Sequence, residues 1–250
     1  MRTIRDKKHL GVTLFIFFFF AGGCKTGEKN LYEQAERLWE RKMYALAAQN
    51  YEQFARQSPR EHPQKAQSLY KAGFIYAYYL LDYPRSIQLF HRLIAIYPNR
   101  VETLKGYHHL AEIYENRLKQ YDLAIAQYKN IINAKKDTPS DFPEYYYYIG
   151  RCYWSMGDWQ KAINTYKKII REFPQQAYAD RAAYQIGYLH FLQGQYQESE
   201  KAFQFFLGNY PDSEWTFEGM YHLAACYDKR NLVDEANQIK KEMKKKFPER

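Results

Sequence analysis

Five prolines recur along this chain at nearly constant intervals, each after a stretch with helical character. They are Pro59, Pro98, Pro174, Pro211 and Pro248, separated by 39, 76, 37 and 37 residues, and 76 is twice 38. A period of 37–39 residues is typical of arrays of helical hairpins. Proline ends a helix and turns the backbone toward the next element. The spacing therefore predicts six hairpins, one of which has Lys136 where the others have proline.

Two positions of the repeat carry a small side chain in every unit. The segment 145–174 (YYYYIGRCYWSMGDWQKAINTYKKIIREFP) defines them, with Gly150 on a first helix and Ala162 on a second. Two helices joined by a short turn reach axial distances of roughly 8–10 Å only where their side chains are small. The first column reads Ala35, Gly73, Ala111, Gly150, Gly187 and Ala224, and the second reads Ala47, Ser86, Ala124, Ala162, Ser199 and Ala236.

The unit at 145–174 resembles the tetratricopeptide repeat (TPR) in Gly150, Tyr153, the Gly157-Asp158-Trp159 turn, Ala162, Tyr166 and Pro174. The resemblance implies an all-α, right-handed TPR solenoid of six helical hairpins. Its first helices would line a concave wall, and each hairpin would cover the apolar surface of the one before it. The approximate repeats are 31–60, 66–100, 104–138, 143–176, 180–213 and 217–250.

The first 23 residues have the three parts of a secretory signal: a basic start, an apolar run and a small-residue exit. The run from Leu10 to Phe20 is 11 residues long, whereas a membrane-spanning helix needs roughly 20. The segment Ala21–Cys24 resembles a bacterial lipobox, which implies cleavage before Cys24 and a diacylglycerol on its thiol. Ordinary signal-peptidase cleavage, which would leave Cys24 as a free thiol, is the alternative.

The sequence thus divides into a lipoprotein signal peptide at 1–23, a short tether at 24–30 and the solenoid at 31–250. Lys25 resembles the sorting pattern of proteobacterial outer-membrane lipoproteins, so we expect a lipid anchor in the outer membrane facing the periplasm. The soluble periplasm is the alternative location. Removal of residues 1–23 takes away four basic residues and one acidic residue, and the net charge falls from +9 to +6. No nucleic-acid partner is expected from this modest charge.

Large apolar residues fill a second-helix column in which the general TPR consensus has alanine: Phe54, Leu93, Ile131, Ile169, Phe206 and Met243. With the NYPDS ending at 209–213, this column resembles the BamD-like outer-membrane assembly lipoproteins and the CpoB-type Tol-Pal-associated proteins. The chain lacks the long middle insertion of the first type and the N-terminal coiled coil of the second. The resemblance implies a lipid-anchored protein-binding scaffold of the cell envelope. A soluble periplasmic adaptor of the Tol-Pal or peptidoglycan machinery is the alternative.

An aromatic residue precedes the first small column by three positions in every unit, and tyrosine occupies five of the six positions. Tyrosine offers a large contact area and a hydroxyl group for a protein or peptide partner. The TPR consensus also uses an aromatic residue here for packing, so both roles stay open. The predicted partner-binding groove comprises Tyr32, Tyr70, His108, Tyr147, Arg151, Trp154, Arg181, Tyr184, Tyr188 and Tyr221.

Catalytic and metal-binding motifs are missing from the sequence, so we expect no enzyme, no cofactor and no small-molecule substrate. His108 and His109 diverge by about 100° on a helix and cannot hold a metal from one face. Cys152 and Cys226 lie two repeats apart, whereas a disulfide needs Cα atoms within about 7 Å. Both cysteines are predicted core residues, and the basic run 239–250 is predicted to be a solvated cap. An enzyme with an unrecognised site is the distant alternative.

Overall fold

The computed structural model describes residues 24–135 and 142–249, with side chains from residue 31 onward. These residues form twelve α-helices and one π-helical turn, without a strand among them, in a TPR-like solenoid. The predicted all-α solenoid of six hairpins is confirmed. The hairpins are α1 (Cys24–Glu40) with α2 (Tyr44–Gln57), α3 (Lys65–Tyr78) with α4 (Tyr83–Ile96), α5 (Val101–Glu112) with α6 (Tyr121–Ala134), α7 (Phe142–Ser155) with α8 (Trp159–Glu172), α9 (Ala179–Leu192) with α10 (Tyr196–Asn209), and α11 (Thr216–Lys229) with α12 (Val233–Lys246).

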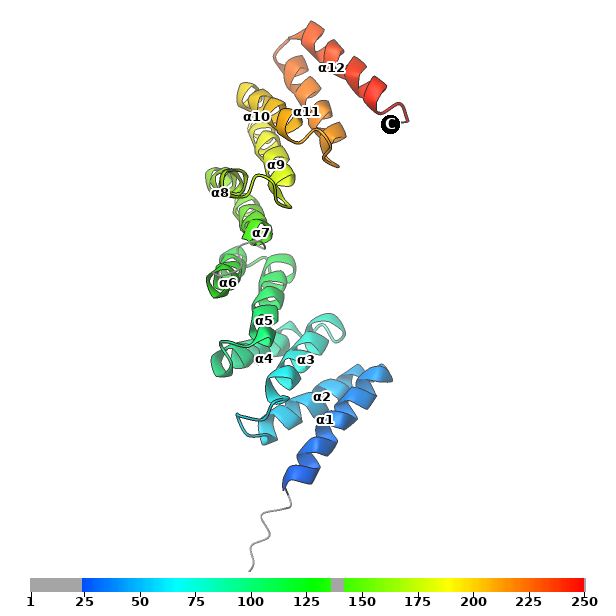
Figure 1. Ribbon diagram of the computed structural model, residues 1–250, viewed down its shortest axis with the longest axis vertical. Helices are drawn as coiled ribbons and strands as arrows, with labels where there is room; N and C mark the ends of the chain where they lie inside the picture. The colour runs from blue at the N-terminus through cyan, green and yellow to red at the C-terminus, as the bar shows by residue number, and fades with distance from the viewer. Residues whose placement is uncertain (1–23, 136–141, 250) are drawn as a thin grey trace, which may run out of the picture.

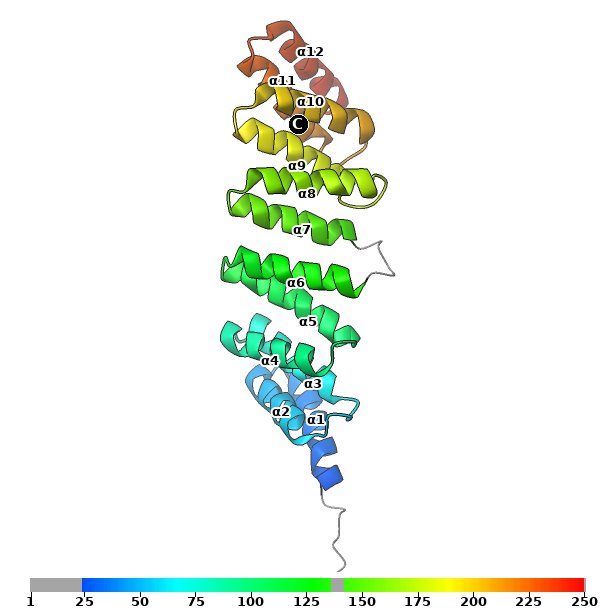
Figure 2. The same cartoon turned by 90° about the vertical axis from the view of Figure 1, so that its left-hand side faces the viewer.

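Consecutive hairpins stack along the long axis of the molecule (Figure 2). In Figure 1 the stack bends into an arc, with the first helices α3, α5, α7 and α9 on its hollow side and the second helices α4, α6 and α8 on its outer side. Among the described residues, the extensive contacts of each hairpin are with its neighbours in sequence, so the core is a continuous column and not a sphere.

Each hairpin turn places one residue in the left-handed region, two positions before its second helix. Only two of the six are glycines, with φ of 79° at Gly157 and 71° at Gly194. The Asp82 and Asp158 side chains then cap their second helices by accepting hydrogen bonds from the backbone N–H groups of Arg85 (3.1 Å) and Lys161 (3.3 Å). The left-handed residues are Lys42, Leu81, Lys119, Gly157, Gly194 and Asn231.

The second and third hairpins each carry one residue more than the fourth between their two small columns. The sequence predicts that the extra residue lengthens the turn in both. In the third hairpin the structure instead absorbs it in the first helix, where a π-helical turn, η1 (Ile113–Arg117), directly follows α5. A single π turn takes up one inserted residue without breaking the helix, so the turn itself keeps the form found in the other hairpins.

The prolines that end the repeats lie where the sequence predicts them. Every described proline of the series comes two residues after the end of a second helix, as Pro174 does after α8. Lys136 lies outside the described residues. All members of both small columns are buried. The second small column is fully buried in all six hairpins, so each hairpin closes tightly.

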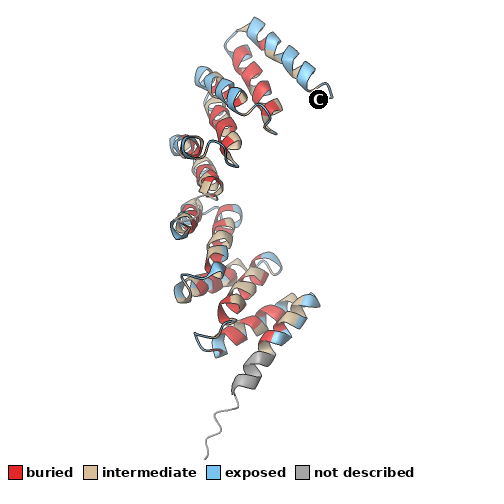
Figure 3. Ribbon diagram, viewed as in Figure 1, coloured by how far each residue is buried: buried red, intermediate tan, exposed pale blue. Residues whose placement is uncertain are grey.

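Helix α1 begins at Cys24, so the backbone of residues 24–30, expected to be a tether, belongs to the first helix. The proposed signal at 1–23 lies outside the described residues. Within the described part of the chain, none of the helices combines the length and the apolar character needed to cross a membrane. In Figure 3 buried residues concentrate on the helices inside the stack, whereas α12 is mostly exposed.

Candidate protein-binding surface

The predicted tyrosine stripe lies mostly inside the solenoid. Tyr32, Tyr147 and Tyr184 keep only 7%, 8% and 6% of their surface exposed. Tyr70 and His108 are half-buried. Tyr221, in the sixth hairpin, is 57% exposed because none of the described hairpins covers it from the far side. The stripe is therefore chiefly a packing column, and it reaches solvent fully at one end only.

Tyr184 illustrates this packing role. Its ring lies 5.2 Å from Trp215 of the next hairpin and 5.8 Å from Phe203 of its own, measured between ring centroids. Burial is the main reason that the pKa of Tyr184 rises to about 12, and the neighbouring Tyr188 and Glu218 raise it further. A ring held on several sides is a poor candidate for large new contacts with a partner.

A second column, which the sequence analysis does not identify, links neighbouring hairpins. We call its members interlock residues: they stand two positions before the first small column, and in hairpins two to six they are Lys71, His109, Tyr148, Gln185 and His222. Four of these five contact an aromatic ring on the second helix of the preceding hairpin.

His109 stacks on Phe90 at 5.7 Å between centroids, and His222 stacks on Phe203 at 5.6 Å. Tyr148 lies 5.3 Å from Tyr128. The Lys71 ammonium lies 5.4 Å from the centre of the Tyr51 ring. The side chains of the column vary from a cation to a phenol, so no residue pattern along the chain reveals it. The column becomes visible only when the contacts between successive hairpins are compared.

Two predicted groove arginines also join neighbouring hairpins. Arg151 Nε donates to Glu115 Oε1 at 2.6 Å, and Glu115 is almost fully buried. Burial lowers the pKa of Arg151, but the hydrogen bond to Glu115 raises it by more, so the pKa lies above its usual value. Arg181 donates to Glu214 at 2.8 Å and lies above the Trp215 ring at 5.3 Å. Both arginines remain only half-buried, so each still presents part of its surface.

The two histidines of the third hairpin differ as the sequence predicts. His109 packs between aromatic rings, and its Nδ1 lies 3.1 Å from Glu112 Oε2. The His108 side chain keeps 32% of its surface exposed, against 14% for His109. Within the described residues, no group of three or more metal-ligating side chains comes together. Cys152 and Cys226 are free and fully buried, which confirms their assignment to the core.

The partly accessible members of the predicted groove are spread along the stack, from Tyr70 and His108 to residues of the later hairpins. Trp154 of α7 and Tyr188 of α9 are half-buried, and their rings meet edge to face at 6.1 Å. Tyr221 of α11 continues this series into the last hairpin. Helices α7 and α9, which carry Trp154 and Tyr188, lie on the hollow side of the arc (Figure 1). This arrangement suits contact with an extended or helical protein segment, because aromatic rings supply most of the energy in such interfaces.

Three segments of the chain match the family model of the tetratricopeptide repeat, at residues 67–100, 144–175 and 181–213. The chain contains tetratricopeptide repeats. The matched TPR segments are the second, fourth and fifth hairpins, and the first, third and sixth share their two small columns. No curated protein matches the sequence.

Solved TPR structures share the fold. The C-terminal part of a TPR repeat-containing protein from Cytophaga hutchinsonii aligns with a TM-score of 0.62 and 16% identity over 86% of this chain and 78% of that one. A TPR protein from Parabacteroides merdae gives a TM-score of 0.57 and 15% identity, with 86% and 77% covered. PilW, described as a type IV pilus biogenesis factor, aligns with a TM-score of 0.53 and 14% identity over 90% of this chain and 96% of that one. Identities this low establish a common fold and no common partner.

Proposed function

We propose that this TPR protein is a lipid-anchored scaffold of the bacterial cell envelope that acts in outer-membrane protein assembly or envelope maintenance, as the BamD-like lipoproteins do. The observation that carries the proposal is the junction at Ala21–Cys24, where a lipobox-like segment follows the apolar run. The first helix of the solenoid begins at the same cysteine. A lipid at Cys24 would therefore join the membrane directly to the repeat array.

TPR solenoids bind proteins through surfaces on their helices, and three accessible aromatic side chains support such a role here. Trp154, Tyr188 and Tyr221 combine apolar rings with polar edges, as interface residues commonly do. The buried Tyr184 ring stacks on Tyr188 at 6.1 Å between centroids and so holds it in place. We therefore propose that the partner contacts the accessible aromatic residues of hairpins four to six.

The test of the anchor is the intact mass of the protein extracted from membranes, compared with the Cys24→Ala variant. We expect the mass of residues 24–250 plus a diacylglycerol and an acyl chain, and loss of this species in the variant. An unmodified chain in the soluble fraction would reject the anchor and favour the soluble periplasmic adaptor.

The test of the surface is capture of an envelope protein after crosslinking in intact cells. Trp154→Ala/Tyr188→Ala should reduce recovery of a specific partner about tenfold or more, the scale of interface hot spots. The matched control is Leu46→Ala/Leu123→Ala, which removes two exposed apolar side chains from the second helices α2 and α6. Equal recovery from both double variants would reject this surface.

A further inference from the structure

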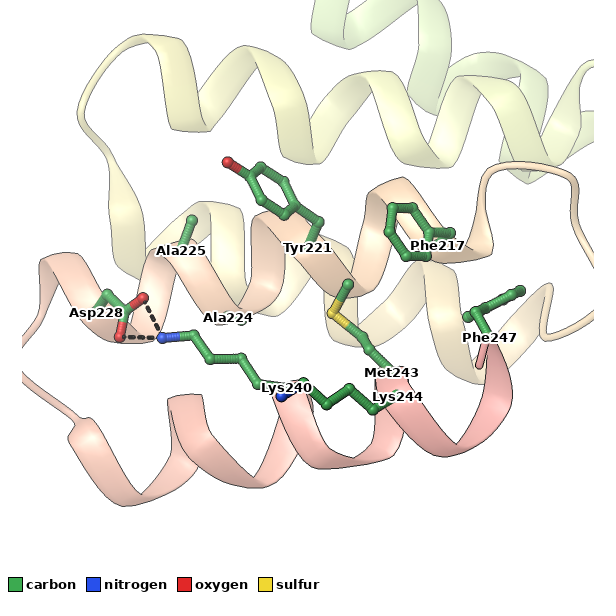
Figure 4. A pocket seen from close by; sticks show the side chains of 9 residues that line it. All are labelled: Phe217, Tyr221, Ala224, Ala225, Asp228, Lys240, Met243, Lys244 and Phe247. Carbon is green, nitrogen blue, oxygen red and sulfur yellow. Dashed lines mark hydrogen bonds and ion pairs between the residues drawn. The ribbon is translucent and has the colours of Figure 1, made fainter. Parts of the chain in front are cut away.

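The last hairpin ends in an open groove between α11 and α12. The groove has a volume of about 300 Å³, and six of the residues that line it are Tyr221, Ala225, Asp228, Lys240, Met243 and Lys244. Figure 4 shows Met243 between the two helices, Tyr221 on α11, and the long Lys240 side chain reaching Asp228. We call this site the end groove. Its walls are apolar, and its edge toward α12 carries two ammonium groups.

The end groove is built from the positions that hold the next hairpin elsewhere in the stack. In the fifth hairpin, Tyr184 stands where Tyr221 stands in the sixth, and it contacts the rings of Trp215 and His222 at 5.2 and 5.9 Å. Phe206 stands where Met243 stands, and a Cβ on Gly219 of α11 would come within 2.6 Å of its ring. The surface that binds α11 in the fifth hairpin is thus repeated in the sixth, where none of the described residues occupies it.

One residue distinguishes the end groove from the corresponding surfaces of the earlier hairpins. Lys240 occupies the column that holds a fully or almost fully buried aromatic ring in every earlier hairpin: Tyr51, Phe90, Tyr128, Tyr166 and Phe203. Its Nζ donates to Asp228 at 2.8 and 3.0 Å. Both side chains are about half exposed, and such a pair contributes little. Lys240 is therefore available to a second carboxylate, and Lys244 lies beside it in the same groove.

The opposite end of the stack is closed by polar residues. In hairpins two to six, the positions one before and two after the first small column are apolar and buried, as Leu223 and Cys226 are in α11. In α1 these positions hold Gln34 and Arg37, which are exposed. Stacking of α1 from a second copy onto the end groove would bury both side chains, including the Arg37 charge, at a high cost. Helix α1 of another copy of this chain is therefore a poor occupant of the end groove.

We infer that the end groove binds an amphipathic α-helix of a partner protein, placed as the first helix of a seventh hairpin. That helix carries a glutamate or aspartate at the interlock position, opposite Lys240, followed one and four residues later by apolar side chains. The inference rests on the scaffold function proposed above, and it names the chemistry that one end of the scaffold recognises.

Helix α9 supplies the probes for a test, because its own sequence has the required pattern with a neutral interlock residue. The parent peptide is residues 176–193, in which Gln185 precedes Ile186 and Leu189. Two variants of the peptide carry Gln185→Glu and Gln185→Lys. Each labelled peptide is titrated into the purified full-length chain, and binding is followed by fluorescence anisotropy.

We expect the Gln185→Glu peptide to bind about three- to fivefold more tightly than the parent peptide, the scale of a partly exposed ion pair. In the Lys240→Glu variant of the chain, the order should reverse in favour of the Gln185→Lys peptide. Lys241→Glu is the matched control, because it changes the same charge one residue further along α12 and does not line the groove. This control should keep the original order.

Equal affinity for the three peptides, no binding of any of them, or no reversal with Lys240→Glu would overturn the inference. Circular dichroism of both variants checks that they fold. The mass measurement on Cys24 and the capture test with Trp154→Ala/Tyr188→Ala change no residue that lines the end groove, so a failure here is distinguishable from a failure of the proposed function.

Discussion

The Tyr166 ring of α8 lies so close to Gly150 of α7 that a Cβ at residue 150 would come within 2.5 Å of Tyr166 Cε1. The same relationship joins Gly73 to Phe90 at 2.9 Å and Gly187 to Phe203 at 2.8 Å. A large buried ring on the second helix therefore requires a glycine opposite it in these three hairpins. The small column and the aromatic column are two halves of one contact.

Gly150→Ala should destabilise the protein by about 1–3 kcal/mol, because the new methyl group forces the Tyr166 ring and the helix out of position. Gly208→Ala is the control: Gly208 lies in α10, and a Cβ there would meet no atom within 4 Å. This change should stabilise the protein by up to about 1 kcal/mol through helix propensity. Urea denaturation measures the free energy of unfolding of both variants. A change in the same direction for both would contradict the packing argument.

Tyr166→Phe should leave the stability unchanged or raise it. The Tyr166 hydroxyl is buried and has no hydrogen-bond partner among the described residues, so its removal relieves a desolvation cost. Tyr128→Phe changes the same column one hairpin earlier, but Tyr128 Oη donates to the buried Glu115 carboxylate at 2.8 Å. Loss of this charged hydrogen bond should cost about 1.5–3 kcal/mol. Equal unfolding midpoints for the two variants would contradict these assignments.

Stability should depend on pH through Glu112. Burial raises the pKa of its carboxyl group, but hydrogen bonds from His109 and Tyr78 outweigh burial and lower the pKa from 4.5 to about 2. The Tyr78 hydroxyl donates to Glu112 Oε2 at 2.5 Å. Because the pKa is lower in the folded state, this stabilisation is fully present above the unfolded-state pKa and is lost as the pH falls toward about 2.

The thermal midpoint of Glu112→Gln should therefore lie below that of the unchanged protein at neutral pH, and the gap should close as the pH falls from 4.5 toward about 2. Glu235→Gln, at an exposed site on α12, serves as the comparison. A gap of constant size across this pH range would show that Glu112 acts through packing and not through its charge.

Thiol reagents should not modify Cys152 or Cys226 in the folded protein. Both side chains are fully buried, and burial raises the pKa of both thiols, which keeps them protonated. Cys226 Sγ also lies 3.2 Å from Ser199 Oγ in the core. Labelling with a maleimide followed by mass mapping should find these cysteines only after addition of denaturant. Rapid labelling of either one without denaturant would mean that the stack opens locally.

Much of the architecture was predictable because its determinants act within one hairpin. Proline stops a helix through its own ring, and the small side chain of Ala162 lets the two helices of a hairpin approach closely. Such features repeat at a fixed interval and can be seen without coordinates. The π-helical turn at Ile113–Arg117 was not predictable in this way, since an extra residue can enter either the turn or the helix before it.

The roles of the groove residues depended on contacts between hairpins. The sequence places Tyr184 and Tyr221 in one column with identical chemistry. One is 6% exposed and the other 57% exposed, because only the first has a following hairpin to cover it. Arg151 is drawn to Glu115, which lies 36 residues earlier, and no local pattern reveals that pair. Binding by the predicted groove residues stays a prediction.

By itself, the sequence determined the number of hairpins, the ends of their second helices and their close crossing, because stop signals and small residues act locally and recur in register. Only the tertiary structure decided which aromatic residues are buried, which histidines interlock and where the stack remains open. Burial is a property of the neighbouring hairpin and not of the residue. Lys240 stands in the same column as Phe203, yet it faces an end groove that none of the described helices fills.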